Sequence, residues 1–294
     1  MILYNMTENI LIIFNPNSGK GRGEKLCNRL VSRFKKNGVE VGRVFCSSSL
    51  EVFENFCTEN KGNPQGFSLA IVIGGDGTLG LCVDRMIKGG FDIPIYPFGR
   101  GTANDFARFF KTNRSVKRVV KIICNNPSVR TVDLLKVNDR DYAVNVAGGG
   151  AFTNGVTKYD PVAKKIFGKL AYISRGVREA VRMKPQIMKF IIDGQESWDR
   201  VYFFLVLNTS NAGGLKWKAS GASPTDGLLN IAILKDDGLF NKVLSYAKAK
   251  EITAIVEGPP APNFTKTDID GNPGGDYPMT VCIATEKLRV VVPE

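Results

Sequence analysis

The stretch Gly74-Gly75-Asp76-Gly77-Thr78 is the strongest candidate for chemistry in this sequence. It follows a short, uncharged, β-branched run at residues 70–73, which is typical of a strand buried on both faces. Glycines allow a sharp turn and a close approach of a ligand to the main chain. Helical spacing of apolar residues begins after Thr78, and a strand, a glycine turn and a helix in series direct backbone N–H groups at a phosphate. A tight βα turn without a ligand is the simpler interpretation, but Asp76 at a strand's carboxyl end favours phosphate binding.

Two further turns have a similar composition. Asn15-Pro16-Asn17-Ser18-Gly19-Lys20 follows an apolar strand, and Gly101-Thr102-Ala103-Asn104-Asp105 follows another at residues 93–97. The first turn is not a Walker loop, because Phe14 stands where the first glycine belongs, and Glu24 replaces the third glycine of a dinucleotide fingerprint. In a parallel α/β sheet all three turns lie at the carboxyl ends of strands, where such folds bind ligands. We therefore expect one site built from three turns.

Aspartates in two later turns are the candidates for proton transfer. The chain contains no histidine, so this role falls to a carboxylate, Lys, Tyr or Cys. Asp270 is the predicted base for deprotonating a hydroxyl, with Asp268 on the same strand face as the fallback. A calcium loop is excluded there, because Pro273 and Met279 stand where Gly and Glu are required. Asp226 lies in an Asp-Gly turn, which is usually only turn chemistry.

Composition limits the class of protein and its partners. A chain of 294 residues with 43% hydrophobic content is long enough for two domains. It has no apolar run near ~18 residues and no signal-peptide pattern, so we expect a cytoplasmic protein without a transmembrane segment. Six cysteines without a C-x-x-C pair indicate reduced, mostly packed thiols. The net charge of +12 favours anionic partners, namely nucleotides, nucleic acid or acidic lipid headgroups.

The elements that position these residues change character along the chain. Strands and helices alternate at first, which indicates a parallel α/β domain at residues 1–134. Strand-like segments dominate afterwards, which indicates an antiparallel β domain at residues 135–294, with one helix near residues 170–183. The extreme C-terminus is predicted to return to the first domain. Residues 158–189 hold nine Lys or Arg against two acids, so this stretch is either a solvated helix face or a surface that approaches an anionic membrane.

Taken together, these motifs resemble the diacylglycerol kinase catalytic-domain family, which includes sphingosine kinases and soluble bacterial lipid kinases. The resemblance continues through residues 167–172, 222–229 and 270–271 and covers nearly the whole chain. It implies an α/β nucleotide-binding domain followed by a β-sandwich domain, with the active site in the cleft between them. The implied reaction is transfer of the ATP γ-phosphate to a lipid hydroxyl.

The resemblance also implies particular site residues. The nucleotide is expected to lie against the three turns and one polar residue after the second strand: Asn15, Ser18, Gly19, Lys20, Ser47, Gly74, Gly75, Asp76, Gly77, Thr78, Gly101, Thr102, Asn104 and Asp105. A structural Mg²⁺ is implied on the Asp226 carboxylate and the backbone carbonyls of Ser223 and Leu228, oxygen ligands that suit a hard cation. Asp270 matches the family's late Asp-Gly motif.

The partners implied by the resemblance are ATP and a lipid substrate at an anionic membrane surface. This places the protein at the inner face of the membrane as a peripheral protein and leaves a homodimer open. We expect no nucleic acid partner, because only the charge supports one.

Two departures from the family pattern keep alternatives open. Gly80-Leu81 stands where the family has Asn-Glu, and Asn272 stands where it has Glu. A small-molecule kinase similar to the NAD kinases is one alternative. A nucleotide- or lipid-binding homologue without turnover is the other.

Overall fold

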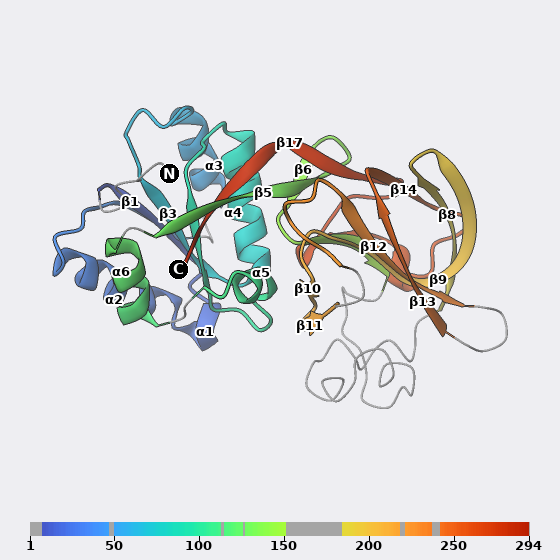
Figure 1. The fold of residues 1–294 in the computed structure, drawn as a ribbon, viewed down its shortest axis with the longest axis horizontal. Helices are drawn as coiled ribbons and strands as arrows, with labels where there is room; N and C mark the ends of the chain where they lie inside the picture. Colours follow the sequence, from blue (N-terminus) through green and yellow to red (C-terminus); the bar gives the residue numbers. More distant parts are fainter. Residues whose placement is uncertain are drawn as a thin grey trace. The chain divides into compact units, whose positions relative to one another are not determined.

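The computed structural model describes residues 8–46, 50–112, 115–125, 127–150, 184–217, 221–236 and 242–293. The chain divides by its contacts into two units, Met1–Val132 with Glu286–Glu294, and Asp133–Thr285. It leaves the first unit within β5 (Ser128–Val137) and returns to it within β17 (Met279–Val292), two long strands that are visible in Figure 1.

The first unit is built on a parallel sheet with the strand order β17-β4-β3-β1-β2. Strands and helices alternate along the chain, as the sequence predicts. The elements are β1 (Ile10–Phe14), α1 (Ser18–Gly21), α2 (Gly23–Lys35), β2 (Val41–Cys46), α3 (Leu50–Glu59), β3 (Leu69–Gly74), α4 (Asp76–Lys88), β4 (Ile95–Gly99), α5 (Asp105–Phe109) and α6 (Val116–Cys124).

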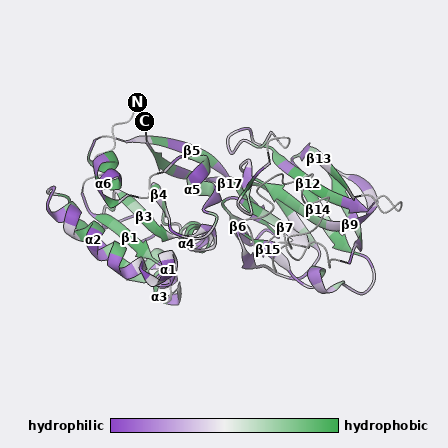
Figure 2. Ribbon diagram, turned by 90° about the horizontal axis from the view of Figure 1, so that it is seen from below, coloured by the Kyte–Doolittle hydropathy of each residue, from purple (hydrophilic) through white to green (hydrophobic). Residues whose placement is uncertain are grey.

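Helices cover this sheet because its central strands are apolar on both faces. All six residues of β3 are buried, which confirms the prediction for the run before Gly74. Ile71 belongs to a cluster with Phe34 of α2 and Val119 of α6. The alternate residues of β3 face the opposite side, where α3 and α4 pack (Figure 1). In Figure 2 the strands β1, β3 and β4 are largely green, whereas purple residues recur along α2.

The second unit is an antiparallel β unit. Along the main path its strands run β16-β15-β7-β9-β8-β14-β17, while β12 pairs with β9, β13 with β12, and β6 with β5. Its elements are β6 (Asp141–Ala143), β7 (Val146–Gly150), β8 (Gln186–Ile192), β9 (Gln195–Leu207), β10 (Asn211–Ala212), β11 (Leu215–Lys216), β12 (Leu229–Asp236), β13 (Lys242–Ala249), β14 (Glu251–Val256), η6 (Pro262–Phe264), β15 (Thr267–Ile269) and β16 (Asn272–Pro273). The helix expected near residues 170–183 lies outside the described residues.

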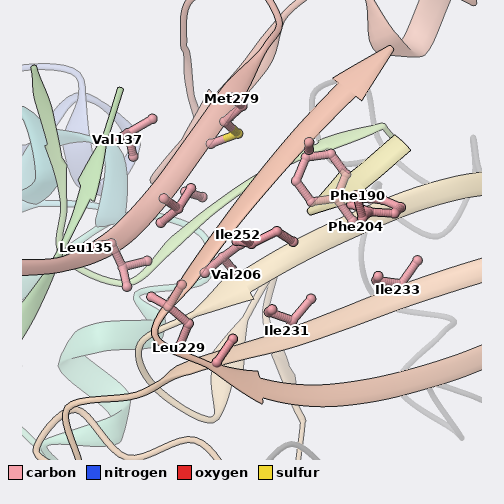
Figure 3. Packing of buried hydrophobic residues seen from close by; sticks show 14 of the residues in the cluster. Leu135, Val137, Phe190, Phe204, Val206, Leu229, Ile231, Ile233, Ile252 and Met279 are labelled. Atoms are coloured by element: carbon pink, nitrogen blue, oxygen red, sulfur yellow. The ribbon is translucent and has the colours of Figure 1, made fainter. Parts of the chain in front are cut away.

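Alternation along the strands divides the apolar residues of this unit into two clusters. Phe204 and Val206 of β9 point into the cluster shown in Figure 3, together with Ile231 of β12 and Met279 of β17. The intervening residues of β9 belong to a second cluster that contains Trp217. A strand that contributes to a core on both faces explains why residues 201–207 are almost continuously apolar.

The apolar pattern alone does not give two of the strand boundaries in this unit. The apolar run at residues 142–146 is divided between β6 and β7, because backbone N–H groups at this point donate to a carboxylate instead of a neighbouring strand. The apolar runs at residues 279–284 and 288–292 form the single strand β17, since no glycine or proline interrupts them.

The cysteines agree with the prediction of reduced, mostly packed thiols, since none is exposed. All six are free, and Cys27, Cys57 and Cys82 are buried. Burial raises the pKa of Cys27 to about 11 and that of Cys57 and Cys82 to about 12, so these thiols stay protonated at neutral pH. Within the described ranges, none of the helices combines the length and apolarity that crossing a bilayer needs.

Candidate active site

The three glycine-bearing turns lie together in the first unit. They follow β1, β3 and β4, which are adjacent in the parallel sheet. Phe14 pairs with Ile73, and Gly74 pairs with Gly99, so the three strands end at the same level. The expected meeting of the turns at the carboxyl edge of the sheet is therefore confirmed.

Hydrogen bonds join each turn to its neighbour. The Asn15 side-chain amide donates to Thr78 Oγ1 at 3.0 Å, which links the first turn to the second. The backbone N–H of Arg100 donates to the carbonyl of Gly74 at 2.6 Å, and the Arg100 carbonyl accepts the N–H of Gly19 at 2.9 Å. Asp76 Oδ1 accepts the N–H of Phe106 at 3.1 Å. The turns thus form one connected structure.

Two of the glycines are required by close packing of main chains. A Cβ added to Gly101 would lie 2.5 Å from the Cα of Gly75, and one added to Gly75 would lie 3.0 Å from the Cα of Gly101. Asn104 supports this contact: its side chain accepts the N–H of Gly101 at 2.6 Å and donates to the Gly101 carbonyl at 2.7 Å. Asn104 is buried and has a φ of +53°, a conformation that asparagine tolerates. The Asn104 side chain therefore fixes the conformation of the turn at residues 101–104.

The other predicted nucleotide-binding residues divide into exposed and buried groups. Lys20, Gly101 and Thr102 are exposed, and the residues from Gly75 to Thr78 are half-buried. Ser18 and Asp105 are buried. Ser18 Oγ donates a hydrogen bond to the Asn15 carbonyl at 2.8 Å. Asp105 is the first residue of α5, and its Oδ1 lies 3.8 Å from Nη1 of Arg108. Ser47 lies outside the described residues.

The arrangement is suited to an anion. The helix α4 begins at the glycine turn, so the positive end of its dipole is directed at this edge of the sheet. Arg100, whose guanidinium lies 4.9 Å from the centre of the Phe98 ring, and the exposed Lys20 add positive charge. Sequence reasoning missed Arg100, although its position between Gly99 and Gly101 was a usable signal.

The carboxylate of Asp270, in the second unit, binds the main chain at residues 144–146. It accepts three backbone N–H groups, from Val144 at 2.6 Å and from Asn145 and Val146 at 2.9 Å each. Asp270 and Gly271 form a two-residue turn between β15 and β16, with φ values of +52° and +82°, the conformation that Asp-Gly favours in hairpins. The Asp270-Gly271 motif therefore closes the hairpin between β15 and β16 and fixes the main chain at residues 144–146.

Asp268 has a different environment. It is 8% exposed, and its Oδ1 accepts the N–H of Gly271 at 2.9 Å. Burial raises its pKa to about 6, and the hydrogen bond from Gly271 opposes part of that rise. A carboxyl group that titrates near neutrality is suited to proton transfer.

A buried polar network near residues 144–146 was missed from sequence. Asn145 Oδ1 accepts the Thr209 hydroxyl at 2.6 Å, and the Asn208 side chain donates to the carbonyls of Asp133 and Val144 at 2.8 Å each. The signal was the polar run at residues 208–211 directly after an apolar strand.

Two of the three groups expected to hold Mg²⁺, the Asp226 carboxylate and the Leu228 carbonyl, accept hydrogen bonds from the protein. Asp226 Oδ2 accepts the Lys248 ammonium at 2.9 Å, and its Oδ1 accepts the N–H of Leu228 at 3.2 Å. The carbonyl of Leu228 accepts the side-chain amide of Asn230 at 3.2 Å. An ammonium on the carboxylate opposes a second cation by charge repulsion. The residues as arranged therefore do not fit the metal site that the resemblance implies.

The fold is that of an α/β protein with three connected glycine-bearing turns at one edge of its sheet and an additional antiparallel β unit. Residues 9–137 match the family model described as the diacylglycerol kinase catalytic domain. This match confirms the resemblance found in the motifs and, with the kinases named below, indicates an enzyme of the lipid kinase type.

Similar proteins cover almost the whole chain. The diacylglycerol kinase of Bacillus subtilis (strain 168) is 26% identical over 96% of this chain and 96% of its own length. The diacylglycerol kinase of Staphylococcus carnosus (strain TM300) is 24% identical over 98% and 96%. A crystal structure of a diacylglycerol kinase from Bacillus anthracis str. Sterne has a TM-score of 0.72 at 22% identity, covering 97% of this chain and 96% of that one, and shows a shared fold.

Proposed function

We propose that this protein transfers the γ-phosphate of ATP to the hydroxyl group of a lipid of the diacylglycerol type. The observation that carries the proposal is the connected group of three turns at the carboxyl ends of β1, β3 and β4, inside the residues that match the diacylglycerol kinase catalytic domain. Phosphoryl transfer depends mainly on positioning and charge neutralisation. The glycine turns at this edge can position the phosphates. The dipole of α4 and the Arg100 cation can neutralise part of their negative charge. Mg²⁺ enters the proposal as the counter-ion of the ATP substrate.

The proton of the lipid hydroxyl needs an acceptor, and two aspartates are candidates. The prediction that Asp270 is the base stays a prediction, but its carboxylate already accepts three N–H groups. Asp268 has one such bond among those described, and its pKa is raised to about 6. We therefore favour Asp268 as the base and Asp270 as the residue that holds the surrounding chain in place.

A direct assay separates the candidate functions. Labelled ATP, supplied as its magnesium salt, is incubated with diacylglycerol, monoacylglycerol, phosphatidylglycerol, a sphingoid base and NAD in separate reactions. A labelled lipid supports the proposal and names the acceptor. Label in NAD alone supports the NAD kinase alternative, and ATP binding without any labelled product supports the non-catalytic one.

Asp76→Asn is expected to lower turnover at least about 10²-fold, because it removes a carboxylate that can hold the Mg²⁺ accompanying ATP, while Oδ1 can still accept the N–H of Phe106. The measurement is kcat with the best lipid acceptor, beside the melting temperature. Asp139→Asn is the matched control, since that side chain is 91% exposed in the second unit. Full activity of Asp76→Asn would contradict a role for this carboxylate in the site.

The lipid acceptor implies that the protein works at a membrane surface. The helices α2 and α6 offer a basic groove, lined by Lys25, Arg29, Arg33 and Lys36 beside Val116. Buried Leu30 and Phe34 turn the opposite side of α2 toward the sheet, so these cations face solvent. Anionic lipid attracts such a surface with about 1 kcal/mol per basic residue. The basic stretch predicted for this role at residues 158–189 falls largely outside the described residues.

Arg29→Glu with Arg33→Glu is expected to weaken binding to phosphatidylglycerol vesicles at least about tenfold, because two attractions become repulsions. Co-sedimentation with vesicles measures the binding, and phosphatidylcholine vesicles show the charge dependence. Lys216→Glu with Lys250→Glu makes the same charge change on exposed residues of the second unit and serves as control. If both pairs weaken binding equally, only net charge matters and the groove has no special part.

A further inference from the structure

The disagreement between the implied metal site and the turn at residues 223–228 has a specific cause, which is Lys248. Lys248 belongs to β13 and lies opposite Asn230 of β12 in the antiparallel register. Because Leu228 is two residues before Asn230, this register brings the Lys248 side chain to the turn that precedes β12. Its ammonium lies 2.9 Å from Asp226 Oδ2.

Two other oxygens of this turn also accept hydrogen bonds. Asp226 Oδ1 and the carbonyl of Leu228 each accept an N–H donor from the chain. The nearby Asp133 carboxylate accepts the N–H of Gly227 at 3.0 Å through Oδ2. Mg²⁺ requires oxygens at about 2.0–2.1 Å in near-octahedral geometry. A cation bound to Asp226 Oδ2 at that distance would lie against the ammonium group.

We propose that the Lys248 ammonium takes the place of the divalent cation at this turn. The chain then holds residues 223–228 through its own positive charge, and the fold of the second unit does not depend on Mg²⁺. This inference concerns stability, so it is independent of the lipid kinase activity. The two side chains are partly exposed, at 44% for Lys248 and 27% for Asp226, so the effect of the pair on stability is modest.

The test is thermal unfolding of the full chain without nucleotide, in EDTA and in increasing MgCl₂. We expect the melting temperature of the parent to be independent of Mg²⁺. Lys248→Ala is expected to melt about 2–4 °C lower in EDTA and to regain that loss in a saturable manner as Mg²⁺ fills the vacated carboxylate. Adding Asp226→Ala to Lys248→Ala is expected to remove the response to Mg²⁺.

Lys235→Ala is the matched control. It removes the ion pair between Lys235 and Asp199, with a 2.7 Å separation and comparable exposure, from the same unit. Its melting temperature should not respond to Mg²⁺. The proposal is overturned if the parent is stabilised by Mg²⁺ in a saturable manner that Asp226→Ala abolishes. It is also overturned if Lys248→Ala has the melting temperature of the parent and that temperature does not change with Mg²⁺.

Discussion

Asp270→Asn is expected to destabilise the second unit by about 2–5 kcal/mol, because it removes the carboxylate whose two oxygens together accept three backbone N–H groups. An amide has one carbonyl oxygen, so at least one of the three donors would face an NH₂ group instead. Backbone strain is not the cause, since asparagine tolerates the φ of +52° at this position. Urea unfolding of parent and variant, followed by tryptophan fluorescence and circular dichroism, measures the loss.

Asp268→Asn is expected to have the opposite effect on stability. The folded-state pKa of about 6 lies above the ordinary value near ~3.9, so ionisation costs stability in the folded protein. This cost is absent below about pH 4, grows as the pH rises toward 6, and is complete above it. Asparagine removes the charge and can still accept the N–H of Gly271. We expect a gain of up to about 3 kcal/mol at pH 8 and no gain at pH 4.

The same substitution tests the proposed base. Turnover of Asp268→Asn should fall by about 10²–10⁴-fold with ATP affinity unchanged, so stability rises while activity is lost. In the parent, turnover should rise with pH to a plateau above about 6. If Asp268→Asn turns over normally while folded Asp270→Asn does not, Asp270 is the base, as the sequence predicts. If neither variant is impaired, neither carboxylate accepts the proton.

Gly101→Ala is expected to weaken ATP binding and to lower kcat/KM by about 10²-fold or more. The added Cβ would lie 2.5 Å from the Cα of Gly75. Because the Cβ is fixed to its own main chain and the atom it meets is main chain, one turn has to move. The contact lies at an exposed turn, so the melting temperature should change little. Isothermal titration with ATP and steady-state kinetics measure the two quantities.

Gly275→Ala is the control for this substitution. Like Gly101, it has no positive φ, and its added Cβ would approach only the end of the Arg140 side chain, at 3.5 Å. This variant should bind ATP as the parent does. Unchanged ATP affinity in Gly101→Ala would show that the contact between the two turns does not shape the nucleotide site.

The local sequence determined the first unit and its candidate site to a large extent. The apolar run before Gly74 predicts a strand covered on both faces, and β3 is buried throughout. The three turns were recognisable because glycine and short polar residues at strand ends carry their information within a few positions. Parallel strands place their carboxyl ends at one edge, so their meeting also followed from the pattern.

Only the tertiary structure decided what the later carboxylates do. The sequence favours Asp270 over Asp268 as the base, yet Asp270 accepts N–H groups from residues more than 120 positions away, and Asp268 is the one with a raised pKa. Asp226 matches a metal motif, but Lys248, brought beside it by the register of β12 and β13, occupies its carboxylate. Hydrogen bonding and burial come from partners distant in the chain, so no local pattern of residues contains them.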